Sequence, residues 1–190
     1  MKMDIKRNVT LEYVKDLQKF TPSFLCNFED NKYDIIFKEI CLKDNNNKVI
    51  LKVENNNFIS TKDIPLDEIK KIKELEQHGI ENSLRMMKYH INLGKLPNYL
   101  KILYKFKVGQ EEVKDLFFLE KFYCNNKLIQ TNDIEFKVCA PNSLNKIEFQ
   151  IDIDKFKKSL NNDPNIKGDT FFFVKKELVI HNKFCIHFSE

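Results

Sequence analysis

Apolar and polar positions alternate over much of this chain, which is typical of β-strands. In residues 99–108, every second side chain from Leu100 to Val108 is apolar, and most positions between them are lysine. Because successive side chains of a strand point to opposite faces, this run predicts a strand with one buried and one solvated face. Runs rich in β-branched and aromatic residues predict seven further strands, at 33–42, 49–53, 116–123, 134–138, 170–175, 177–180 and 183–188.

Turn-forming residues separate most of these runs. Asparagine clusters follow the first predicted strand at 45–47 and the fourth at 125–126, and Asn132-Asp133 and Pro141-Asn142 are further turn signals. Short strands divided by turns are typical of an antiparallel sandwich and not of an alternating strand–helix array. We therefore expect an all-β, immunoglobulin-like β-sandwich.

Three segments have helical patterns instead. Residues 9–20 carry apolar side chains three positions apart, which predicts a short amphipathic helix before Thr21-Pro22. Residues 61–82 are densely charged around a few apolar positions and predict a surface helix inserted between strands, and 152–160 predict another helix. A length of 190 residues suits one core. We expect an N-terminal segment, 1–20, and a single sandwich domain, 21–190.

The composition favours an apolar interior and argues against nucleic acid as a partner. The chain has 17 Phe and 6 Tyr, a large aromatic content that either packs a core or lines an apolar ligand site. Its 32 basic and 28 acidic residues are interspersed, so no basic stripe of the kind that follows a phosphate backbone is present.

Sequence motifs for catalysis, metal binding and membrane insertion are missing. There is no GxSxG elbow, HExxH or CxxC pair, and 4 Gly in the whole chain argue against a glycine-rich phosphate loop. We therefore expect no enzymatic activity, no metal and no cofactor. No run approaches the ~20 apolar residues of a membrane span. The first residues have no apolar signal region, so we expect a cytoplasmic protein, and Lys2 excludes myristoylation of the chain itself.

One carboxylate stands out in an apolar strand. By alternation, Glu120 shares a face with Phe118 and Phe122. If that face is exposed, Glu120 is an ordinary edge residue. If it turns inward, the carboxylate needs a partner and becomes an acceptor at the rim of an apolar cavity, where a few polar groups orient a ligand. Tyr89 is a second candidate of this kind.

Three ordered segments resemble one protein family. Residues 24–35, residues 120–143 and residues 169–183 are similar to segments of the uncoordinated-one-nineteen carriers, the myristoyl-binding branch of the GMP phosphodiesterase delta-subunit superfamily. The similarity extends over most of 17–188. This resemblance implies a sandwich whose sheets part to admit the acyl chain of N-myristoylated proteins, with release by an Arf-like small GTPase in its GTP state.

The same resemblance assigns roles to individual residues. It implies that Glu120 and Tyr89 hold the first peptide groups of the N-terminal glycine. It implies that six residues line or flank the lipid channel: Ile40, Tyr99, Phe122, Phe136, Ile151 and Phe172. Phe122 replaces a histidine of the family pattern, Phe172 replaces a tyrosine, and residues 59–82 do not match. These departures bear on the preference for cargo sequence and chain length.

Two alternatives remain open from the sequence. A prenyl carrier of the delta-subunit type would bind a C-terminal lipidated cysteine and would have no use for Glu120 as a glycine acceptor. An interaction sandwich would bind proteins through its outer strands and no lipid, and it would have a closed core without a cavity. Whether delivery is to a cilium, a flagellum or another membrane also stays open.

Overall fold

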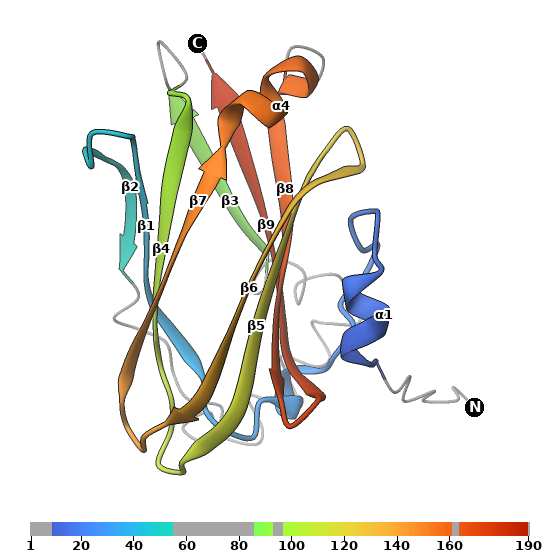
Figure 1. Cartoon of the computed structure of the whole chain (residues 1–190), viewed down its shortest axis with the longest axis vertical. Coiled ribbons are helices and arrows are strands. Elements are labelled where there is room, and N and C mark those ends of the chain that lie inside the picture. The colour runs from blue at the N-terminus through green and yellow to red at the C-terminus, as the bar shows by residue number, and fades with distance from the viewer. Residues whose placement is uncertain (1–8, 55–85, 93–96, 161–163, 190) are drawn as a thin grey trace, which may run out of the picture.

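Two β-sheets pack face to face in the computed structural model, which describes residues 9–54, 86–92, 97–160 and 164–189 (Figure 1). The four-stranded sheet has the order β2-β1-β4-β7 and the five-stranded sheet the order β3-β9-β8-β5-β6. Neighbouring strands are antiparallel except for the parallel pair β3–β9. The strands are β1 (Ile36–Lys43), β2 (Val49–Glu54), β3 (Met86–Asn92), β4 (Tyr99–Lys107), β5 (Val113–Cys124), β6 (Lys127–Cys139), β7 (Leu144–Asp152), β8 (Asn165–Val174) and β9 (Glu177–Ser189). The prediction of an all-β sandwich is confirmed.

The main core lies between the two sheets and is largely aromatic. Alternation turns Tyr104 and Phe106 of β4 inward, where they face Phe118 of β5 and Phe172 of β8. The Phe172 ring makes edge contacts with the rings of Phe106 and Phe118 at centroid distances of 5.4 and 5.0 Å. Such contacts add about 0.5–1.5 kcal/mol each beyond the burial of apolar area. The high phenylalanine content therefore packs this core.

A second, smaller core covers the outer face of the five-stranded sheet. Helix α1 (Leu11–Lys15) begins after Thr10, whose side chain accepts a hydrogen bond from the Tyr13 N–H. Val14 of α1 is fully buried against Phe171 and Phe173 of β8. In Figure 1, α1 lies beside this sheet on the side away from the four-stranded sheet. Both faces of β8 are therefore buried, which explains its continuous apolar run.

Two further helices lie at the ends of the sandwich. The one-turn 3-10 helix η1 (Phe28–Asp30) lies near β9, and α4 (Ile153–Leu160) follows β7 and packs against β4 and β5. The buried residues of α4 are Ile153, Phe156 and Leu160, a spacing of three and four that gives it one apolar face. The helix predicted in 152–160 is confirmed, the helix predicted in 9–20 forms only over Leu11–Lys15, and the helix predicted in 61–82 lies outside the described residues.

Several strands differ from the sequence prediction. Strands β3 and β7 were not predicted, and β9 is one strand where two were expected. Strand β6 runs through Asn132-Asp133, which the sequence predicted as a turn. This prediction was wrong because these residues pair with Glu120 and Leu119 of β5, and the long ladder overrides their local turn preference.

Candidate functional site

The side chain of Glu120 points into the core between the sheets. Strand β5 continues in regular alternation through this region, so Glu120 lies on the same face as Phe118 and Phe122, and all three side chains are 0% exposed. Its neighbours in the ladder are Thr170 of β8 and Asn132 of β6. Of the two interpretations left open by the sequence, the exposed edge position is wrong and the inward-facing carboxyl is right.

Only one oxygen of this carboxyl has hydrogen-bond partners among the described residues. The Tyr104 hydroxyl donates a short hydrogen bond to Glu120 Oε1, and the Thr170 hydroxyl donates to the same oxygen at 3.4 Å. Glu120 Oε2 is buried without a partner. Burial raises the pKa of Glu120 to about 8, although the hydroxyls of Tyr104 and Thr170 and the Asn132 amide act in the opposite direction. The carboxyl is therefore mostly protonated at neutral pH.

A small apolar cavity lies between the sheets near the edge formed by β2 and β3. Tyr104 lines it, so this residue connects the cavity with Glu120. The complete lining is Ile40, Leu42, Leu51, Met87, Tyr89, Ile102, Tyr104, Phe184 and Ile186. Its volume of about 10 Å³ is the space of about one water molecule, far below the ~300 Å³ of the smallest typical ligand pockets. As the described residues form it, this cavity is too small to hold a lipid chain.

The predicted site residues are distributed unevenly around this cavity. Ile40 and Tyr89 line it, and the Tyr89 hydroxyl donates to Met87 Sδ at 2.9 Å, while burial raises its pKa to about 12. The others are Phe122, Ile151 and Phe172, which are buried in the core, Phe136, which is half-buried against Phe106, and Tyr99, which is 42% exposed at the start of β4. The structure therefore brings all of them except Tyr99 to the main core.

Three polar residues of this site were missed by sequence reasoning. Alternation in β4 indicates that Tyr104 shares the inner face with Ile102 and Phe106, so this position could have been found. Thr170 and Asn132 could not, because their nearness to Glu120 depends on the registers of β5 with β8 and β6. Register is a tertiary property that a single strand does not encode.

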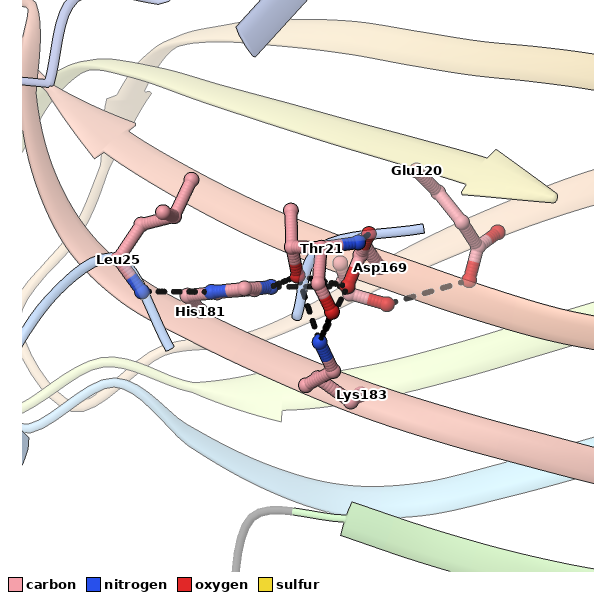
Figure 2. Close-up of polar contacts among 7 residues, drawn as sticks. Thr21, Leu25, Glu120, Asp169, His181 and Lys183 are labelled. Atoms are coloured by element: carbon pink, nitrogen blue, oxygen red, sulfur yellow. Dashed lines mark hydrogen bonds and ion pairs between the residues drawn. The ribbon is translucent and has the colours of Figure 1, made fainter. Parts of the chain in front are cut away.

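A second polar cluster lies on the outer face of the five-stranded sheet, beneath the N-terminal segment. Figure 2 shows Thr21, Asp169, His181 and Lys183 in mutual contact, with Glu120 on a neighbouring strand. The Thr21 N–H and hydroxyl donate to the two oxygens of Asp169 at 3.0 and 2.8 Å. Lys183 Nζ donates to the Thr21 hydroxyl at 2.6 Å and lies 3.5 Å from Asp169 Oδ1. All four side chains are buried. The cluster therefore anchors the N-terminal segment to β8 and β9.

Although this cluster contains a hydroxyl, an imidazole and a carboxylate, it is not arranged for nucleophilic catalysis. The Leu25 N–H donates to His181 Nδ1 at 3.0 Å, so the ring carries its proton on Nε2 and donates it to Asp169 Oδ1, also at 3.0 Å. The acceptor nitrogen is therefore occupied and cannot take a proton from Thr21. The contacts are those of a structural anchor.

The described part of the chain offers neither a cluster of metal ligands nor a membrane-spanning helix. The residues that the structure describes contain no group of three or more His, Cys, Asp or Glu side chains placed to hold a metal ion. Within the same ranges, no helix is both long and apolar enough to cross a bilayer.

Comparison with known proteins identifies the family. The model of the family described as GMP-PDE, delta subunit, matches residues 29–188. The chain belongs to the GMP-PDE delta-subunit family. Among its relatives, this family member is 27% identical to the protein unc-119 homolog B-A of Xenopus laevis over 182 residues, 90% of the chain and 70% of that protein. It is 27% identical to protein unc-119 of Caenorhabditis elegans over 190 residues, 94% of the chain and 78% of that protein.

A human relative extends the same pattern. The protein unc-119 homolog B of Homo sapiens is 27% identical over 186 residues, which cover 90% of the chain and 68% of that protein. These comparisons confirm the resemblance that the sequence segments indicated. Membership in the delta-subunit family supports a lipid-binding carrier fold, and this family is of a carrier type and is not known as a family of enzymes.

Proposed function

We propose that this chain is a cytoplasmic carrier that takes the N-terminal myristoyl or a similar acyl chain of a lipidated protein between its sheets. The cargo stays in solution until an Arf-like small GTPase in its GTP state releases it at a membrane. The observation that carries the proposal is the fully buried carboxyl of Glu120, with one oxygen that has no partner among the described residues. Such a group destabilises a closed core, so its presence favours a role in binding a polar ligand group.

The energetics of acyl transfer are compatible with such a carrier. Each buried methylene contributes about 0.8 kcal/mol, and a single myristoyl chain binds membranes only marginally. An aromatic interior such as this one can therefore compete with a bilayer for the chain. A polar acceptor beside it adds selectivity, because a ligand without the matching donor leaves that acceptor unpaired.

The placement of Glu120 and the cavity indicates how the cargo would lie. Glu120 is on β5, whereas the cavity is lined by β3 and β9, which lie three and two strands away in the same sheet. At about 4.8 Å per strand, this separation is roughly 10–14 Å. The amide head of the cargo would lie at Glu120, and its acyl chain would pass Tyr104 and Phe172 toward the cavity.

The small volume of the cavity favours a second candidate function. An interaction sandwich that binds proteins through its outer strands would need no internal space, and a cavity of about 10 Å³ agrees with that requirement. The carrier must instead open its core, and the burial of the acyl chain has to offset the packing energy of the closed sheets. The two functions therefore differ in whether an acylated peptide binds at all.

Fluorescence anisotropy separates the candidates. A labelled N-myristoyl-glycine peptide is titrated with the protein, alongside the unacylated peptide and a peptide with a C-terminal farnesylated cysteine. We expect acyl-dependent binding that Glu120→Ala weakens about tenfold or more, since leaving the buried N–H of the cargo without its acceptor costs ~1–3 kcal/mol. Glu148→Ala on β7 is the matched control, because the Glu148 side chain is 47% exposed, and it should bind like the wild type.

Each other outcome rejects part of the proposal. If neither lipidated peptide binds, the carrier function fails and the interaction sandwich is favoured. If only the farnesylated peptide binds, the chain is a prenyl carrier. If the bound peptide is not displaced by a GTP-loaded Arf-like GTPase, the proposed release step is wrong while the carrier function stands.

A further inference from the structure

Two buried polar atoms without a hydrogen-bond partner among the described residues belong to residues that face each other across one ladder. Glu120 on β5 pairs with Asn132 on β6, and the atoms are Glu120 Oε2 and Asn132 Nδ2. Buried polar atoms are almost always hydrogen-bonded in folded proteins, so two such atoms side by side need an explanation. A side-chain amide always presents a donor on its nitrogen, and a carboxylate oxygen is an acceptor.

The orientation of the Asn132 amide is fixed by Gln130 on the same strand, which is itself held by the opposite sheet. Gln130 Nε2 donates to Asn132 Oδ1 at 2.8 Å and to the Gln150 carbonyl at 2.7 Å. Gln130 Oε1 in turn accepts from the Asp152 N–H at 3.2 Å, so two backbone groups of β7 hold the Gln130 amide in place. Because Gln130 uses the oxygen of Asn132, the nitrogen is the end that remains without a partner.

The orientation of Glu120 is fixed in the same way. Tyr104 of β4 and Thr170 of β8 both donate to Oε1. Oε2 is therefore the oxygen left for a ligand. The Asn132 amide interacts with the Glu120 carboxyl and lowers its pKa, but neither Asn132 Nδ2 nor Glu120 Oε2 has a partner at hydrogen-bond distance and angle among the described residues. Residues of four strands, β4, β5, β6 and β8, thus position one acceptor and one donor, and neither atom has a partner among the described residues.

We propose that Glu120 and Asn132 together bind the main-chain N–H and C=O of one extended residue, namely the residue that carries the acyl chain of the cargo. In an extended chain, the N–H and C=O of one residue point to the same side, as they do when two residues of an antiparallel ladder exchange both hydrogen bonds. Glu120 accepts from the N–H, and Asn132 donates to the C=O. This inference rests on the proposed function and adds Asn132 as a second residue that determines specificity.

The paired site predicts which lipids are rejected. A hydrocarbon tail with an alcohol or a simple alkyl amide as its head leaves at least one of the two buried atoms without a partner, and sites built around such hydrogen bonds discriminate strongly against ligands that lack the group. Free fatty acids lack both the amide N–H and the main-chain carbonyl of the acylated residue. The head, and not the chain, therefore decides which acyl compounds bind.

Three ligands test the inference on the wild-type protein. They are an N-myristoyl-glycine peptide, an ester analogue in which oxygen replaces the N–H, and an analogue in which a methylene replaces the glycine carbonyl. We expect each analogue to bind about tenfold more weakly than the parent peptide. Free myristate is the fourth ligand, and it should bind more weakly still.

Variants then assign each hydrogen bond. Asn132→Ala should abolish the discrimination against the methylene analogue and keep that against the ester, whereas Glu120→Ala should do the reverse. Thr131→Ala, an exposed neighbour on β6, is the matched control and should keep both ratios. Because ratios between ligands are compared within one protein, a loss of stability in a variant does not produce the pattern.

The acceptor role also makes affinity depend on pH. Among the groups that face Glu120, namely Tyr104 of β4, Thr170 of β8 and Asn132 of β6, only Tyr104 is titratable, and burial raises its pKa well above the usual value, so it stays neutral. Because Oε1 already accepts from two hydroxyls, the proton of the neutral carboxyl lies on Oε2, and Oε2 must lose it to accept the N–H. The affinity of the wild type for the myristoyl-glycine peptide should therefore rise from pH 6.5 to 8.5, whereas the affinity of the Glu120→Ala variant for the same peptide should not.

The outcomes separate this inference from the proposed function. If the wild type binds the myristoyl-glycine peptide but Asn132→Ala keeps both ligand ratios, Asn132 does not contact the cargo and the inference is overturned. Equal weakening of all ligands by Asn132→Ala also overturns it, because that result indicates that Asn132 only supports Glu120. Absence of binding by every acylated ligand would reject the proposed function itself.

Discussion

The buried carboxyl of Glu120 makes the stability of the protein depend on pH. Its pKa is raised from 4.5 to about 8 by burial, so the folded state holds a proton that the unfolded chain releases at a lower pH. A group with a raised folded-state pKa contributes its full stability below the unfolded value. That contribution is lost as the pH rises from about 4.5 through about 8.

Replacing Glu120 by glutamine tests this dependence. Glutamine is neutral at every pH, so the free energy of unfolding of Glu120→Gln relative to the wild type should increase between pH 5 and 8, with a slope of at most ~1.4 kcal/mol per pH unit. Urea unfolding at several pH values measures the difference. A difference that does not change with pH would mean that the carboxyl ionises normally in the folded protein.

Among the elements, the N-terminal segment is held by a buried polar cluster as well as by the packing of its short helix. Asp169 of β8 binds Thr21 and His181 and lies 3.5 Å from Lys183 Nζ, and all these side chains are buried. Burial lowers the pKa of Lys183, and Asp169 opposes this effect. The carboxylate therefore compensates for a lysine that would otherwise be buried alone.

Asp169→Asn should consequently reduce the free energy of unfolding by about 3 kcal/mol, because it leaves the Lys183 ammonium without its countercharge. Thermal or urea unfolding measures the loss. Glu135→Gln is the matched control: it removes the exposed ion pair with Lys137 on β6 and should change stability by less than ~1 kcal/mol. Similar effects of both substitutions would show that the anchor contributes little.

The same elements indicate how far the sequence predicts this fold. Strong alternation predicted β4 with the correct face, and the phenylalanine-rich run of β8 was recognised as a strand. Strand β3 was missed because it pairs in parallel with β9, and a parallel pair has no local hairpin signal. The turn signal at Asn132 failed because a 13-residue strand pairs along its whole length with β5.

The residues of the candidate site also differ in how far the sequence predicts them. The inward face of Glu120 and the apolar character of its surroundings follow from alternation, which is local. Its partners Tyr104, Thr170 and Asn132 come from three other strands, and only the registers of the ladders bring them together. Sequence reasoning therefore found the central residue of the site and could not identify its neighbours.

On the scale of the whole molecule, the two open sides of the sandwich differ. On one side the Gln130 amide of β6 donates to the Gln150 carbonyl and accepts from the Asp152 N–H of β7, whereas the cavity lies at the other side, near β2 and β3. With a volume of about 10 Å³, this cavity is too small for an acyl chain. In the proposed carrier, entry of an acyl chain into this cavity would therefore be coupled to separation of the sheets.

This coupling predicts the kinetics of binding. If opening precedes entry of the chain, the observed association rate of a fluorescent myristoyl-glycine peptide should reach a plateau as the concentration of the peptide, in excess over the protein, is raised. Ile102→Ala, which enlarges the cavity, should raise the plateau rate while reducing stability by about 2–5 kcal/mol. Stopped-flow fluorescence measures the rate, and urea unfolding measures the stability. A rate that stays linear to high concentration and is unaffected by Ile102→Ala would contradict the opening step.

The close packing of the core also affects what the proposed carrier binds when it holds no cargo. A hollow pocket lined with phenylalanine would attract detergents, free fatty acids and the exposed surfaces of other chains. Here the rings of Phe106, Phe118 and Phe172 pack against each other. A molecule that has only a hydrocarbon chain therefore gains little free energy by displacing them. In the proposed carrier, such a closed core would leave the protein vacant in the presence of abundant free lipids until a cargo with the matching head group binds.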